Sequence, residues 1–244
     1  MKYLKTHPFG VRAHFEHSVV LTFAVDKAQI SALIPECLEL DTYHDHTAFI
    51  AVAMVNTLNL RPKGFPQFLG SDFFLVGYRI FVRYRDKRGK SLRGLYILKT
   101  ETNKKRMEVL GNLFTHYQYS TIDVSDRQEQ GVRTISSKAA DFEVEIIEQE
   151  GEKMLPLDSP FDNWQDARKF AGPLPHTFSF DKIDQKVLIV RGLRKHWRPE
   201  PIKVNKCYFG FLDSLRLENI KLASVFQIKN IPYEWEKGRV EKWK

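Results

Sequence analysis

The sequence predicts an α+β protein: an antiparallel-rich curved sheet that closes into a cone or barrel, with a few flanking helices. Three observations lead to this fold class. Most of the 244 residues fall into segments rich in β-branched and aromatic residues, only two or three short segments have helical periodicity, and no linker or internal repeat divides the chain. We therefore expect a single domain spanning residues 1–244.

The composition favours a soluble globular protein with a basic surface. Hydrophobic residues make up 43% of the chain, the net charge is +8, and the only cysteines are Cys37 and Cys207. Two thiols in a chain of this length do not form a disulfide framework, so a reduced, cytoplasmic location is expected. No apolar run reaches the length of a membrane span, so no membrane partner is expected. The cations are scattered, which makes nucleic acid an unlikely partner.

The first third of the chain predicts three strands and one helix. Residues 18–25 read as a buried strand, Asp26 as the N-cap of a helix that ends before Pro35, and residues 38–43 and 47–60 as two further strands. The strand over 47–60 is apolar on both faces, which predicts a central position in the sheet.

Residues 73–119 carry the densest mixture of apolar, aromatic and ionisable side chains. They predict a hairpin, with strands over 73–84 and 92–101 joined by a turn at 86–90, followed by a helix over 103–114. A turn centred on Arg88 places Arg79 opposite Ile97 and Gly77 opposite Lys99, within a residue or two. One face of this hairpin is then apolar, and the other combines Arg79, Lys99 and Glu101 with apolar residues.

The second half of the chain is mostly strands. Segments 117–124, 132–137, 142–148, 176–180, 186–191, 203–212 and 220–228 have strand character. Ser159 and Pro160 predict a helix start, as N-cap and first helical residue, and Gly172-Pro173 predicts the end of that helix.

The mixed face of the hairpin leaves two interpretations open. It either meets water, with Lys99 and Glu101 as a surface pair, or it lines a cavity. Gly77 favours a cavity slightly, because glycine weakens a strand unless something must approach it closely. Two further patterns stay open in the same way. Lys104 and Lys105 at a helix start form either an anion site or a solvated helix end, and His44 and His46 are more typical of a solvated turn than of a metal site. No cofactor or metal is expected.

Several phrases of the sequence resemble a known family. They include Leu33-Ile34-Pro35-Glu36-Cys37-Leu38-Glu39-Leu40, Gly94-Leu95-Tyr96-Ile97-Leu98 and Val109-Leu110-Gly111. Together they are similar to the bacterial DUF2071 (YqjF-like) family, which is related to acetoacetate decarboxylase. The resemblance implies a sheet enclosing a mostly apolar cavity. It does not imply the decarboxylase reaction, because the paired lysines of that enzyme, one of which forms a Schiff base, would fall on Phe114 and Thr115.

Two functional hypotheses follow. The first is a pocket inside the sheet for a small molecule that bears a carboxylate or phosphate, with the reaction unknown. Arg79 or Lys99 would hold the anion and His116 could act as an acid or base near neutral pH; the candidate lining residues are Arg79, Tyr96, Lys99, Glu101, Asn112, His116 and Tyr119. The second is a non-enzymatic interaction protein whose basic surface binds an acidic partner. Either could form a homo-oligomer.

Overall fold

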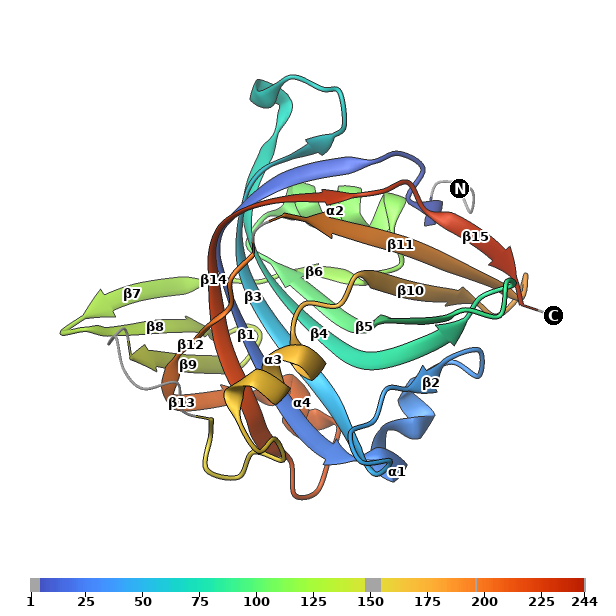
Figure 1. The fold of residues 1–244 in the computed structure, drawn as a ribbon. Helices are drawn as coiled ribbons and strands as arrows, with labels where there is room; N and C mark the ends of the chain where they lie inside the picture. Colours follow the sequence, from blue (N-terminus) through green and yellow to red (C-terminus); the bar gives the residue numbers. More distant parts are fainter. Residues whose placement is uncertain (1–4, 148–154, 196, 244) are drawn as a thin grey trace.

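The computed structural model describes residues 5–147, 155–195 and 197–243, and its main feature is one large, strongly curved sheet (Figure 1). The long strands of this sheet are β1 (Val11–Asp26), β3 (Thr47–Pro62), β4 (Ser71–Arg85), β5 (Ser91–Thr102), β10 (His176–Asp181), β11 (Lys186–Arg194) and β14 (Lys221–Trp235). Shorter strands pair along it: β2 (Glu39–Leu40), β6 (Tyr119–Thr121), β12 (Glu200–Pro201) and β15 (Arg239–Lys242).

The large sheet closes on itself into a ring. Its strands run in the order β14-β1-β3-β4-β5-β10-β11, and β11 pairs again with β14. Three residue pairs make this seam, among them Gly192 opposite Trp235 and Arg194 opposite Tyr233. Neighbouring strands of the ring are antiparallel except β5 and β10. The predicted fold class is therefore confirmed, and so is the central position of β3, between β1 and β4.

A second, smaller sheet covers one flank of the ring (Figure 1). It has four strands in the order β13 (Lys203–Phe209), β9 (Phe142–Ile147), β8 (Val132–Ser137) and β7 (Ser125–Glu129). Ile135, Val144 and Ile146 from this sheet join the main hydrophobic core, together with side chains such as Val52 and Tyr78 from the ring. Burial of these apolar side chains holds the two sheets together.

In the described part of the chain, four α-helices lie in the connections between strands: α1 (Lys27–Ile30), α2 (Lys105–Phe114), α3 (Trp164–Ala171) and α4 (Gly210–Ser214). Asp26 caps α1 as predicted, because its side chain accepts a hydrogen bond from the backbone N–H of Ala28. The predicted cap at Ser159 is wrong. Asn163 caps α3 instead, and the Ser159 hydroxyl donates to the carbonyl of Ala223.

Other strand bounds differ from the prediction where tertiary pairing overrides local pattern. Only Glu39–Leu40 of the segment 38–43 pairs as a strand, and α4 occupies the end of the segment 203–212. The segment 220–228 continues as β14 to Trp235 because both β1 and β11 pair with its second half. Position 148, the end of another predicted strand, lies outside the described residues. In the described part of the chain, no helix has the length and apolarity needed to cross a membrane.

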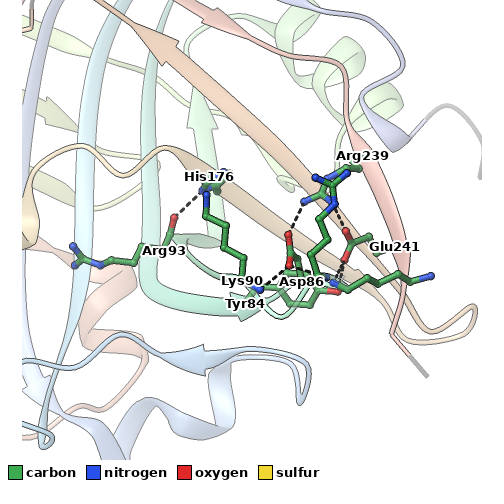
Figure 2. Close-up of polar contacts among 9 residues, drawn as sticks. Tyr84, Asp86, Lys90, Arg93, His176, Arg239 and Glu241 are labelled. Carbon is green, nitrogen blue, oxygen red and sulfur yellow. Dashed lines mark hydrogen bonds and ion pairs between the residues drawn. The ribbon is translucent and has the colours of Figure 1, made fainter.

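The last strand, β15, holds the turn of the β4–β5 hairpin in place through hydrogen bonds and ion pairs (Figure 2). The hydroxyl of Tyr84 donates to the Glu241 carboxylate at 3.0 Å, and the backbone N–H of Lys87 donates to the same oxygen at 3.2 Å. Arg239 pairs with both Glu241 and Asp86, which are almost fully buried.

The carboxyl of Asp86 makes the contact between the turn and β15 sensitive to acid. Burial alone would raise the pKa of Asp86, but the backbone N–H groups of Lys90 and Arg88 and the charge of Arg239 outweigh it and lower the pKa. A carboxyl whose pKa is lower in the folded than in the unfolded protein stabilises the fold above its unfolded pKa. That contribution is lost as the pH falls through its folded pKa.

Replacing Glu241 with alanine will destabilise the protein by about 1–3 kcal/mol, because the Tyr84 hydroxyl and the Lys87 N–H lose their acceptor. The measurement is the free energy of unfolding in urea. Val240→Ala at the neighbouring position is the control: Val240 is 44% exposed, so a change of less than about 0.5 kcal/mol is expected. Equal effects of the two substitutions would show that the contacts of Glu241 with the turn contribute nothing to stability.

Candidate functional site

A cavity of about 290 Å³ lies inside the ring of strands. Residues from all seven ring strands line it, which is possible only for a space that the ring encloses. Helix α2 contributes Met107, Leu110 and Phe114, and the segment after α3 contributes Pro173 and Leu174. Most of the lining is aliphatic or aromatic, as is usual for small-molecule sites.

Arg79, from the middle of β4, is the charged group at the centre of this arrangement. It lines the cavity, and no hydrogen bond or ion pair joins its guanidinium to any described residue. Burial lowers the pKa of Arg79, whereas the nearby phenols of Tyr233, Tyr119 and Tyr117 act in the opposite direction. Burial of a cation without a counter-charge is unfavourable, so an anion in the cavity would relieve this cost.

Gly77 makes room for Arg79. A Cβ atom at position 77 would lie 2.9 Å from Nη2 and 3.0 Å from Nε of Arg79, closer than such atoms approach in proteins. The guanidinium therefore lies flat against the β4 backbone two residues before its own position. The glycine at position 77 predicted that some group approaches this strand closely. That group is the guanidinium of Arg79.

Two other arginines line the cavity, and both are already engaged. Nε and Nη1 of Arg61 donate to the carbonyls of Phe65 and Asn59. Arg194 donates to the carbonyl of Pro173 and, at 3.2 Å, to the hydroxyl of Tyr233. No aspartate, glutamate or lysine is among the described residues that line the cavity. Arg79 is thus the cavity arginine without a partner in the described chain.

Three tyrosines supply hydroxyl groups near Arg79. Burial raises the pKa of Tyr119 to about 12 and raises that of Tyr117 as well, so both phenols are neutral donors at physiological pH. The Tyr117 hydroxyl lies beside Thr177 but has no partner in hydrogen-bonding geometry. The side chain of Asn112 holds Tyr119 in place, because it donates to the Tyr119 carbonyl and accepts from its N–H, both at 2.8 Å.

A β-bulge separates Lys99 and Glu101 from Arg79. Arg79 lies opposite Ile97 as predicted, but the register shifts at the next residue, so Lys99 lies opposite Tyr78 and Thr100 opposite Gly77. The predicted pairing of Gly77 with Lys99 is off by one residue. Because side chains alternate between faces, this extra residue puts Thr100 on the cavity face and turns Lys99 and Glu101 to the other face.

On that other face, Lys99 and Glu101 satisfy each other. Their charged atoms are 2.5 Å apart, the Tyr78 hydroxyl is 3.3 Å from Glu101, and the Lys99 amino group lies 5.1 Å from the ring centre of Phe211. Tyr96 also points away from the cavity and packs against the main core. Lys99 and Glu101 therefore neither form a surface pair nor line the cavity. They lie between the ring and α4.

The remaining predicted residues lie near the cavity without lining it. Asn112 acts on the cavity only through Tyr119. His116 is half-buried in the loop after α2, and burial lowers its pKa. Lys105 pairs with Glu108 at 2.6 Å on the surface, and Lys104 borders a separate shallow pocket, so the two do not form a joint anion site. Of the predicted lining residues, the structure brings Arg79 and Tyr119 together.

The sequence analysis missed several residues of the site. Tyr233 and Trp235 lie beyond the predicted end of β14, and His7 precedes the first predicted strand. The imidazole of His7 is buried, its Nδ1 has no hydrogen-bond partner, and burial lowers its pKa. Dense aromatic spacing at Tyr117 and Tyr119 was the one signal that could have pointed to a phenol cluster. In the described chain, no group of three or more His, Cys, Asp or Glu side chains could hold a metal ion.

Comparison with solved structures finds the same fold in enzymes of low sequence identity. Acetoacetate decarboxylase from Legionella pneumophila superposes with a TM-score of 0.61 at 12% identity, covering 96% of this chain and 88% of that chain. An acetoacetate decarboxylase-like enzyme from Sphingomonas wittichii RW1 gives a TM-score of 0.61 at 9% identity, covering 98% and 95%. The enduracididine biosynthesis enzyme MppR, complexed with pyruvate, gives 0.61 at 8% identity, covering 97% and 92%.

These enzymes show the fold alone, because their sequences are so different. No curated protein matches the sequence significantly. The family comparison is more direct: the family of uncharacterised conserved proteins known as DUF2071 matches residues 12–226, which is most of the ring and all of the second sheet. The chain belongs to the DUF2071 family and has an acetoacetate decarboxylase-like fold.

Proposed function

We propose that the cavity binds a small organic carboxylate and that Arg79 is its anchor. The observation that carries this proposal is an unpaired, desolvated guanidinium in a cavity whose described lining has no acidic side chain. The guanidinium presents parallel N–H donors that match the two oxygens of a carboxylate. Tyr117 and Tyr119 add neutral hydroxyl donors beside it.

A carboxylate fits this site better than a phosphate. At neutral pH a phosphate carries up to two negative charges, whereas Arg79 is the one cavity arginine in the described chain that is not already engaged by protein groups. A dianion would therefore leave a buried charge without compensation, which is unfavourable. A carboxylate carries one charge and would be neutralised by Arg79 alone.

The proposed function does not include Schiff-base chemistry. That chemistry requires an uncharged lysine amine next to the substrate carbonyl. No lysine is among the described residues that line the cavity, and Lys99 is held on the other face by Glu101. The solved enzymes with this fold support a small-molecule pocket, and one of them was complexed with pyruvate. Their reactions are not transferred to this chain.

The alternative hypothesis of a basic docking surface receives less support. Three cations on the hairpin strands are engaged within the chain. Arg83 and Arg93 both pair with the buried carboxylate of Asp41, each at 2.6 Å, and Lys99 pairs with Glu101. The exposed hairpin cations gather at the turn, at positions 85–90, and do not form a stripe along the strands.

The substitution Arg79→Met will have two effects of opposite sign. Carboxylate affinity will fall by about tenfold to a hundredfold, because charge-assisted hydrogen bonds contribute roughly 1.5–3 kcal/mol. The ligand-free protein will become more stable, because a buried cation is replaced by an apolar side chain of similar length. Calorimetric titration with octanoate measures the first effect and thermal unfolding the second.

The matched control is Arg85→Gln on the same strand, at an exposed position with the same side-chain direction. It should change neither carboxylate affinity nor thermal stability appreciably. If Arg79→Met binds octanoate as tightly as the original protein does, Arg79 is not the anchor.

Gly77→Ala tests the placement of Arg79 while the charge remains. The new methyl group would occupy the space of the guanidinium, so Arg79 must move away from the β4 backbone. We expect carboxylate affinity to fall by about tenfold, although alanine is the better strand residue and should keep the protein folded. The test compares octanoate titrations with urea unfolding. Unchanged affinity would show that the flat orientation of Arg79 is not required.

A further inference from the structure

The cavity combines one unpaired cation with a mostly apolar lining. Arg79 lies on β4, and its neighbours on β3 are small and apolar, because Ala51 is opposite Arg79 and Ala53 is two residues along the strand. Beyond them, the opposed residues Val55 and Leu75 continue the apolar lining on the same two strands. A ligand that satisfies both the cation and this lining must carry an anionic head and a hydrophobic body.

The cavity is too large for a short keto acid. At roughly 30 Å³ per water molecule, its volume of about 290 Å³ corresponds to about ten water molecules. A carboxylate beside Arg79 would occupy only a small part of this space. Water fills apolar cavities poorly because each molecule needs two to four polar partners. Filling the remaining volume therefore requires apolar atoms of the ligand.

Small side chains on β3 create this space. Ala51 and Ala53 are buried, yet both line the cavity, so their short side chains leave the volume open. On another side the apolar lining reaches the surface: Leu110 of α2 lines the cavity and is 36% exposed. The apolar lining thus extends from β3 to α2, which suits an extended body.

We infer that the ligand is an amphipathic monocarboxylate with a hydrophobic body on the order of six to ten carbons. This inference rests on the proposed function, in which Arg79 holds the carboxylate. The head group lies at Arg79, beside Ala51 and Ala53, and the body extends along β3 past Val55 and Leu75 toward the apolar residues of α2. Arg79 provides recognition of the head group, and the apolar volume beyond it selects the length of the body.

The test is a calorimetric titration with straight-chain monocarboxylates from butyrate to dodecanoate, together with octan-1-ol. Affinity should rise about fourfold for each added methylene until the body fills the cavity, and then level off. Octan-1-ol should bind at least tenfold more weakly than octanoate, because it cannot pair with Arg79.

A cavity-filling variant locates the body. Val55→Phe, four residues along β3 from the position opposite Arg79, should make the affinity level off at a shorter chain, whereas Val55→Thr, which barely changes the volume, should leave that chain length unchanged. Thermal unfolding checks that both variants are folded. A series for Val55→Phe identical to that of the original protein would place the body elsewhere and overturn the inference.

The possible failures can be told apart. If butyrate binds as tightly as octanoate, the inferred hydrophobic body is wrong and the carboxylate-binding function stands. If octan-1-ol binds as tightly as octanoate, or no carboxylate of any length binds, the proposed function fails and the inference fails with it.

Discussion

The seam between β11 and β14 is the constraint on which the rest of the site depends. Without these pairings the large sheet would be an open curved surface, and the side chains of β3 and β10 could not face one enclosed space. The seam also builds the cavity directly, because the opposed residues Arg194 and Tyr233 both line it. At Gly192 the missing side chain leaves room for the Tyr233 phenol, since a Cβ atom there would lie 2.2 Å from the hydroxyl oxygen. The pairings that close the sheet thus also form the cavity.

Within that enclosure, a single charge dominates the electrostatics. Arg61 and Arg194 are tied to backbone carbonyls, so they mainly hold loops in place. Arg79 has no such task in the described structure. Its unpaired guanidinium is the feature on which the proposed carboxylate binding rests. Burial raises the pKa of Tyr117 and Tyr119, so these two phenols add neutral donors beside it.

The sequence predicted the fold and part of the site. The correct predictions rest on local patterns, and each wrong one has a physical cause. Alternating side chains predicted the strands, and turn composition at residues 86–90 placed Arg79 opposite Ile97. Gly77 correctly indicated a close approach. What failed depends on contacts between distant segments. The bulge after Tyr78 leaves no local signal, and Tyr233 belongs to a strand whose second half is stabilised by partners far away in the chain. Ser159 has the local chemistry of a helix cap but is used to bind the backbone at Ala223.

The bulge in β5 has a consequence for the chemistry that this fold can support. Leu98 is the extra residue that shifts the register, and it keeps the amino group of Lys99 out of the cavity. In a regular ladder with the same sequence, Leu98 would lie opposite Tyr78 and Lys99 opposite Gly77, so the side chain of Lys99 would point to the cavity face. A primary amine would then stand where Thr100 now stands, close to Arg79. The backbone irregularity of β5, more than its composition, thus keeps this amine away from the cavity.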